Sequence, residues 1–125
     1  MARIAVVNND TDFLTLMHDL LTEGGWDSFL CREADICAQT IKQEQPDLVI
    51  LDIRMGTPEG GWTILELLTL DPATRQIPVI VCSADHRELQ DKADWLRQHS
   101  ILTLPKPFDL DDLYQTVSSA LGGER

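Results

Sequence analysis

The sequence predicts a doubly wound α/β fold, in which helices cover both faces of a parallel sheet of five strands. Two observations support this prediction. Apolar runs without polar alternation, such as residues 48–51 and 79–82, are typical of strands that are buried on both faces. Segments with helical periodicity lie between these runs, and connections of that length join parallel strands through right-handed crossovers.

The first β/α unit begins with the apolar run at residues 4–7, which we expect to form a strand. From Thr11 onward apolar residues recur at helical spacing, Thr11 can act as the N-cap, and Gly24 with the glycine after it ends the helix. The next run, residues 26–31, is more polar than its neighbours, which favours a strand at the edge of the sheet.

The second and third units surround the central strand, which is expected at residues 48–51. A helix is predicted before it, over residues 34–43, with four inward-facing side chains: Ile36, Cys37, Thr40 and Ile41. After the strand, residues 54–61 contain three glycines and a proline, which indicates a loop. A third helix begins near Trp62 and ends before Pro72, because the residue that precedes a proline is disfavoured in a helix.

The last two units complete the alternation of strands and helices. The apolar run 79–82 predicts the fourth strand, and the run 101–104 predicts the fifth. A fourth, more polar helix between them is indicated by Leu89, Ala93 and Leu96. A fifth helix follows at residues 110–121, so residues 1–125 are interpreted as one domain.

Composition limits the classes of function. The 125 residues suffice for one ordinary domain with a sizeable core. The 10 basic and 21 acidic residues give a net charge of -11, which argues against direct binding to nucleic acid. No apolar run is long enough to cross a membrane and no signal-peptide core begins the sequence, so we expect a cytoplasmic protein without membrane contact.

The three cysteines, Cys31, Cys37 and Cys82, suggest neither a disulfide framework nor a metal site. Their number is odd, and no Cys-x-x-Cys motif or suitably spaced histidine accompanies them. We therefore expect three free thiols that pack as small apolar side chains in a reducing cytosol.

Polar residues follow four of the predicted strands at their carboxyl ends, which meet at one edge of a parallel sheet. In doubly wound folds this edge is where ligands bind. The residues concerned are Asn8, Asn9, Asp10, Asp52, Ser83 and Lys106. A carboxylate, a hydroxyl and an ammonium group gathered there suit phosphoryl transfer, which depends mainly on positioning and on neutralising charge.

The chain resembles the receiver domain of two-component response regulators, and the similarity extends from Ile4 to Leu121. The segments that match best are residues 46–55, 77–84 and 106–108. The resemblance implies a flavodoxin-like sheet with the strand order 2-1-3-4-5. It also implies that the protein takes part in phosphorelay signalling.

Specific roles follow from the resemblance. Asp52 would accept a phosphoryl group from a sensor histidine kinase or a histidine phosphotransfer protein. Ser83 would hydrogen-bond to that group, Lys106 would pair with its charge, and the bond between Lys106 and Pro107 would be cis. The pocket would promote only its own phosphorylation and slow hydrolysis, so no other enzymatic activity is expected.

At the metal site the sequence departs from the family, which usually has two acidic residues where this chain has Asn8 and Asn9. The resemblance implies Mg²⁺ coordination by Asn9, Asp52 and the backbone carbonyl of Arg54, with Asp10 as a further candidate ligand. Magnesium prefers hard oxygen ligands, so the loss of charged oxygens predicts weak binding.

We interpret the chain as a stand-alone response regulator that signals by changing its surface. In the family, the surface formed by the fourth helix, fifth strand and fifth helix changes on phosphorylation and binds a downstream protein. A switch residue of the fifth strand, usually aromatic, rotates inward. Thr103 takes that position here, and because it has little surface to bury, we expect a weakly coupled rearrangement. A homodimer is compatible with this arrangement.

Two other functions remain open. A receiver-like interaction module that does not respond to phosphorylation would keep the fold for docking; the amides at positions 8 and 9 favour it, whereas Asp52, Ser83 and Lys106 argue against it. An FMN-binding flavodoxin would share the strand order but needs a phosphate-binding loop after the first strand. The acidic, glycine-free segment 8–12 does not provide one.

Overall fold

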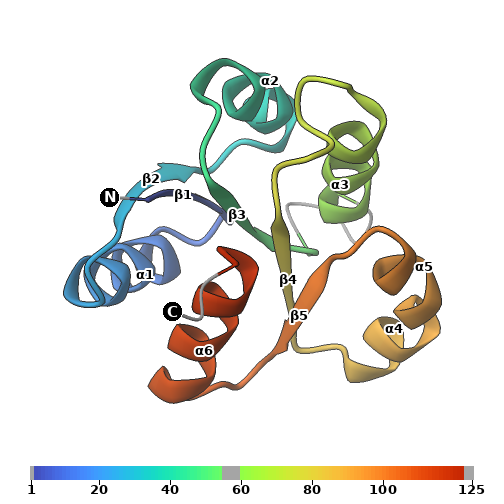
Figure 1. Cartoon of the computed structure of the whole chain (residues 1–125). Helices are drawn as coiled ribbons and strands as arrows, with labels where there is room; N and C mark the ends of the chain where they lie inside the picture. The colour runs from blue at the N-terminus through green and yellow to red at the C-terminus, as the bar shows by residue number, and fades with distance from the viewer. Residues whose placement is uncertain (1, 55–59, 123–125) are drawn as a thin grey trace.

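The computed structural model describes residues 2–54 and 60–122 and shows a parallel sheet with helices on both faces (Figure 1). The strands are β1 (Arg3–Val7), β2 (Asp27–Cys31), β3 (Leu48–Asp52), β4 (Val79–Ser83) and β5 (Leu102–Pro105). The helices are α1 (Thr11–Glu23), α2 (Ala34–Glu44), α3 (Gly60–Leu70), α4 (His86–Asp91), α5 (Ala93–Gln98) and α6 (Leu110–Ala120). The strands pair in the order β2-β1-β3-β4-β5, which confirms the predicted fold. Most of the predicted loop at 54–61 lies outside the described residues.

The core consists of two apolar layers, one on each face of the sheet, because successive side chains of a strand point to opposite faces. Figure 1 shows α1 and α6 on one face and the other helices on the opposite face. The strand residues beneath α1 and α6 include Ile4, Val6, Leu48, Ile50, Ile80 and Leu104. Those of the opposite layer include Ala5, Val7, Val49, Leu51, Val79 and Val81. Both faces are covered, which explains why the central strands β1, β3 and β4 appear in the sequence as apolar runs.

The N-cap of α1 is Asp10, so the prediction of Thr11 is wrong. Oδ1 of Asp10 accepts hydrogen bonds from the backbone N–H of Asp12 at 3.0 Å and of Phe13 at 3.4 Å. A carboxylate here satisfies N–H groups that have no partner within the helix and also interacts favourably with the positive end of the helix dipole. The helix ends at Gly24, as predicted.

Helix α2 buries fewer side chains than its sequence predicted. Cys37 and Ile41 are fully buried, but Ile36 is 49% exposed and Thr40 is only half-buried. The helix packs beside α3 and above the edge strand β2, so only a narrow side of it, with residues four apart, meets the core. The prediction that Ile36 faces inward is therefore wrong.

The predicted fourth helix is divided into α4 and α5. The backbone of Lys92, between them, departs from helical values, with φ of -99° and ψ of 6°. Its side-chain ammonium lies 5.0 Å from the centre of the Trp62 ring in α3. Leu89 of α4 and Leu96 of α5 are both buried, so each of the two short helices turns a predicted apolar residue toward the core. None of the helices in residues 2–54 and 60–122 is long and apolar enough to span a membrane.

The cysteines also differ from expectation. Cys31, at the end of β2, and Cys37, in α2, form a disulfide across Cα atoms that are 6.0 Å apart, a separation typical of disulfides. The prediction of three free thiols is thus wrong for this pair. The turn between β2 and α2 brings the two cysteines together, and their spacing along the chain does not indicate this pairing. Cys82 is free and buried, as expected, and burial raises its pKa to about 12.

Candidate functional site

Asp52 occupies the carboxyl end of β3, beside Cys82 of β4, at the edge where the sequence predicted a site. Its side chain is only 13% exposed. Oδ2 accepts a hydrogen bond from Nδ2 of Asn8 at 2.8 Å and lies 3.4 Å from Nζ of Lys106. Oδ1 accepts a hydrogen bond from the backbone N–H of Arg54 at 3.1 Å. Both carboxylate oxygens therefore have donors, and one of them has a cationic partner.

Lys106 reaches Asp52 from the loop that follows β5. The backbone N–H of Lys106 donates to the carbonyl of Ser83 at 2.8 Å, which continues the pairing of β5 with β4. Its ammonium lies 4.6 Å from the centre of the Phe13 ring, so an aromatic face and a carboxylate together orient it. The Lys106–Pro107 peptide bond is cis in the structure, as the resemblance implied.

Ser83 ends β4 and is buried, with 2% of its surface exposed. Its Oγ accepts a hydrogen bond from the backbone N–H of Asp85 at 3.0 Å. The hydroxyl hydrogen can still donate, because a serine oxygen accepts and donates at the same time. The structure thus places Asp52, Lys106 and Ser83 at the carboxyl ends of three adjacent strands.

Asn8 has a direct role at Asp52 that sequence reasoning missed. Its side chain is buried, and the amide oxygen accepts a hydrogen bond from the backbone N–H of Asp10 at 2.8 Å while the amide nitrogen donates to Asp52. A carboxylate can only accept and a backbone N–H can only donate, so these two partners fix the orientation of the amide. An aspartate at this position could not donate to Asp52.

The other two residues predicted near the metal behave differently from Asn8. Asn9 is exposed, and Asp10 uses Oδ1 to cap α1. Within residues 2–54 and 60–122, no group of three or more His, Cys, Asp or Glu side chains is placed to hold a metal ion. Among the described residues named for the metal, the oxygens that remain are the Asp52 carboxylate and neutral oxygens, which are ligand types that Mg²⁺ accepts.

The first turn of α4 contacts the site from the side, through residues that the sequence did not single out. Asp85 caps α4 by accepting from the N–H of Glu88 at 3.0 Å, and its other oxygen pairs with the Arg54 guanidinium at 3.0 Å. The Glu88 N–H, and then Arg54, hold the pKa of Asp85 below its usual value. His86 contacts the Lys106 carbonyl through Nε2 at 2.8 Å. Asp85 was detectable as an N-cap residue before a helix; the contact of His86 was not.

Thr103, the predicted switch position, is exposed on β5. It lies on the wall of a pocket of about 530 Å³ between β5 and the α4–α5 segment. The other wall residues include His86, Leu89, Gln90, Ala93, Leu96 and Leu102. His86 belongs both to this pocket and to the contact with Lys106, so the pocket and the Asp52 site share a residue.

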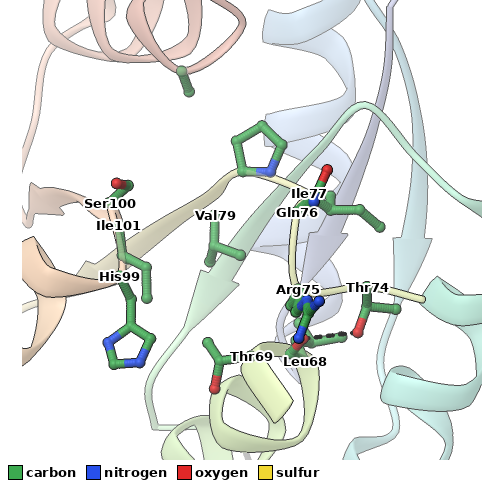
Figure 2. A pocket seen from close by; sticks show the side chains of 12 residues that line it. Leu68, Thr69, Thr74, Arg75, Gln76, Ile77, Val79, His99, Ser100 and Ile101 are labelled. Carbon is green, nitrogen blue, oxygen red and sulfur yellow. Dashed lines mark hydrogen bonds between the residues drawn. The ribbon is translucent and has the colours of Figure 1, made fainter. Parts of the chain in front are cut away.

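A second pocket, of about 420 Å³, opens at the opposite, amino end of the strands (Figure 2). Its walls come from the end of α3, the segment before β4 and the turn before β5, with Arg75 and His99 among the residues. The hydroxyl of Thr74 donates to the carbonyl of Leu68 at 2.8 Å, so this polar atom is already satisfied. None of the predicted site residues lines this pocket.

The sequence profile of the response regulator receiver domain matches residues 4–118. The chain belongs to this family. Among curated relatives, the transcriptional regulatory protein ZraR of Escherichia coli (strain K12) is 30% identical over 118 residues, which are 94% of this chain and 26% of that protein. GlrR of the same strain is 30% identical, over 96% of this chain and 26% of its own length. The receiver chain thus spans about a quarter of the length of these relatives.

Solved structures support the receiver fold. A sensor protein from Polaromonas sp. JS666 superposes with a TM-score of 0.84 at 24% identity, covering 97% of this chain and 96% of that chain. The receiver domain of sensor histidine kinase PA1611 from Pseudomonas aeruginosa PAO1, described with a magnesium ion in its active site cleft, gives 0.81 at 19% identity, covering 98% of both chains. NtrX from Brucella abortus gives 0.82 at 26% identity, over 97% of this chain and 27% of that chain.

Proposed function

We propose that this receiver domain accepts a phosphoryl group on Asp52 from a sensor histidine kinase or a histidine phosphotransfer protein. The observation that supports this most is the placement of the Lys106 ammonium 3.4 Å from Oδ2 of Asp52, with the Ser83 hydroxyl at the end of the adjacent strand. A nucleophilic carboxylate, a fixed cation and a hydroxyl donor are the groups that phosphoryl transfer to a carboxylate requires.

The transfer is a substitution at phosphorus. An Asp52 oxygen forms the new P–O bond, the P–N bond of the phosphohistidine donor breaks, and the imidazole leaves with the bonding electron pair and takes up a proton. Lys106 neutralises part of the charge that the transferred group brings into the pocket, and the Ser83 hydroxyl donates to one of its oxygens. The backbone N–H of Arg54 holds the carboxylate in a fixed direction.

Magnesium would be held by Asp52, by the amide oxygen of Asn9 and by the backbone carbonyl of Arg54. When bound, the ion would supply positive charge opposite the phosphoryl oxygens. Recruiting Asp10 as well would remove the carboxylate that caps α1, which typically costs about 1 kcal/mol. We therefore expect weaker Mg²⁺ binding than in receivers that carry the full acidic pair.

The signal would leave through the surface of α4, α5, β5 and α6, where a downstream protein would bind. The α4 end of this surface already contacts the site through Asp85 and His86. Thr103 lies on the same surface but is exposed, so little apolar area is available to couple its position to phosphorylation. The cytoplasmic, stand-alone arrangement expected from the sequence stays a prediction.

A second candidate function is a receiver-like interaction module that does not respond to phosphorylation. The hydrogen bond from Asn8 to Asp52 supports it, because this bond occupies a carboxylate oxygen that would otherwise face the metal or the incoming phosphorus. The intact ion pair between Asp52 and Lys106 argues for the first function, since a docking module has no need of it.

Intact-mass measurement after incubation with acetyl phosphate and Mg²⁺ separates the two functions. The wild-type chain should gain the mass of one phosphoryl group, and Asp52→Asn should gain none. Asp111→Asn makes the same chemical change on the exposed first turn of α6 and should be labelled like the wild type. Labelling of Asp52→Asn to the wild-type extent would refute the assignment of the acceptor, and an unlabelled wild type would favour the interaction module.

A further inference from the structure

We propose that Cys31 and Cys37 are a reversible thiol–disulfide modification site whose oxidation state sets the reactivity of Asp52 through Asn8. This inference rests on the proposed phosphoryl-acceptor function. It starts from two facts. The two cysteines form a disulfide, and the backbone carbonyl of Cys31 is hydrogen-bonded to the backbone N–H of Asn8 at the site.

The link from the disulfide to the acceptor consists of two consecutive hydrogen bonds. The backbone carbonyl of Cys31 accepts from the backbone N–H of Asn8 at 3.1 Å, which extends the pairing of β2 with β1 by one residue. The side chain of the same asparagine donates to Oδ2 of Asp52 at 2.8 Å. Displacement of Cys31 therefore changes the position of the amide that occupies the acceptor carboxylate.

The disulfide is a covalent tie between Cys31, the last residue of β2, and Cys37, in the first turn of α2. The N-cap residue of this helix, Glu33, makes no side-chain capping hydrogen bond. A helix without such a cap lacks one of the usual supports of its first turn. The covalent bond from Cys37 to Cys31 thus replaces a cap in tying α2 to the edge strand, and its reduction frees the turn between them.

The chemistry needs a two-electron partner, and a small-molecule disulfide of the glutathione class supplies it. In the oxidising direction, the two thiols lose two protons and two electrons, one S–S bond forms between Cys31 and Cys37, and the S–S bond of oxidised glutathione breaks to give two reduced glutathione molecules. Both cysteines are buried, and the exposed residues Arg32 and Glu33 form the turn between them, so the exchange requires this turn to open. Cys82 takes no part, because its side chain packs in the apolar layer on the opposite face of the sheet from Cys31 and Cys37.

The direction of the effect follows from the hydrogen bonds. The oxidised state holds the Asn8 amide on Asp52 and keeps an oxygen of the nucleophile occupied. The reduced state loosens this contact, so Asp52 should take up phosphoryl groups about 2-fold to 10-fold faster, which corresponds to the usual net contribution of one hydrogen bond.

The test compares the whole chain after treatment with oxidised glutathione or with dithiothreitol, each reagent being removed before measurement. Alkylation under denaturing conditions followed by mass measurement counts the free thiols, and Cys82 should be alkylated in both states. We expect the side-chain amide resonances of Asn8 to differ between the states, and acetyl phosphate labelling to be faster in the reduced state. Cys37→Ser should match the reduced state under both treatments, whereas Cys82→Ala should keep the difference.

Each outcome decides the proposal. Three free thiols after oxidised glutathione, or identical Asn8 resonances and equal labelling rates in the two states, would overturn it. Labelling at equal rates would leave the acceptor function intact. Different Asn8 resonances without labelling in either state would instead support the link from the disulfide to Asn8 while refuting the acceptor function.

Discussion

The substitution Asn8→Asp should destabilise the metal-free protein markedly at neutral pH. It removes the 2.8 Å hydrogen bond to Oδ2 of Asp52 and introduces a second carboxylate at a position that is 2% exposed. A hydrogen bond to a charged group contributes about 1.5–3 kcal/mol. Two like charges about 4 Å apart repel by about 4 kcal/mol at an effective dielectric constant of 20. Side-chain movement, entry of water and the positive charge of Lys106 offset part of this cost. We therefore expect the free energy of unfolding to fall by about 2–4 kcal/mol.

The pH dependence of the loss distinguishes repulsion from a packing defect. Two adjacent carboxylates share a proton more readily than isolated ones, so the folded variant binds protons more tightly than its unfolded chain does. The variant should therefore be close to the wild type below about pH 4 and lose stability as the pH rises above it. Mg²⁺ should restore stability at neutral pH, because the added carboxylate becomes a ligand.

Urea unfolding of both proteins, at acidic and neutral pH and with and without Mg²⁺, measures these effects. Asn9→Asp is the matched control, since the same change at an exposed residue should alter stability by less than about 0.5 kcal/mol. It should nevertheless tighten Mg²⁺ binding, as titration followed by amide shifts would show. Equal stability of Asn8→Asp and the wild type in metal-free buffer at neutral pH would refute the reasoning.

Three further predictions concern single groups of the site and its supports. Lys106→Met should slow acetyl phosphate labelling of Asp52 by about 100-fold or more, because one preorganised charge is commonly worth that much in a transfer reaction. The far-ultraviolet circular dichroism should stay unchanged. A rate within about threefold of the wild type, which is the effect of a single hydrogen bond, would contradict this prediction. Asp10→Ala should lower the free energy of unfolding by about 1 kcal/mol, and Thr11→Ala by clearly less, because Asp10 caps α1; urea unfolding that ranked the two in the opposite order would restore Thr11 as the cap. The pKa of Asp85 is lower in the folded state, so this carboxylate adds stability above its unfolded pKa, and that stability is lost as the pH falls through the folded pKa. The urea midpoint of Asp85→Asn should therefore fall less steeply on acidification than that of the wild type. Parallel profiles would show that the Arg54 and Glu88 contacts do not act on this carboxyl.

Much of the fold could be predicted from local patterns. The central strands β1, β3 and β4 were predictable because both faces of the sheet are covered, so each of them is an apolar run bounded by turn residues. Strand order followed from the family resemblance and from the handedness of β/α crossovers. Helix α2 was less predictable, because its position at the sheet edge leaves Ile36 exposed although its spacing fits an inward side.

The site was predictable in its members but not in its contacts. Asp52, Ser83 and Lys106 were found because each follows a strand, and the carboxyl ends of parallel strands meet at one edge. The bond from Asn8 to Asp52, the pairing of Arg54 with Asp85 and the Cys31–Cys37 disulfide depend on the directions of side chains at the ends of strands and helices and in the turns beside them. Single-sequence spacing does not determine those directions, so only the three-dimensional arrangement reveals them.

The most direct test of the central claim is to locate the phosphoryl group within the chain. After labelling with acetyl phosphate, borohydride reduces an aspartyl phosphate to homoserine, and peptide mass spectrometry then identifies the altered residue. We predict that homoserine forms at Asp52 alone and that the Asp52→Asn variant yields none. Homoserine at another aspartate of the wild-type chain, such as Asp10, with Asp52 unmodified, would contradict the account.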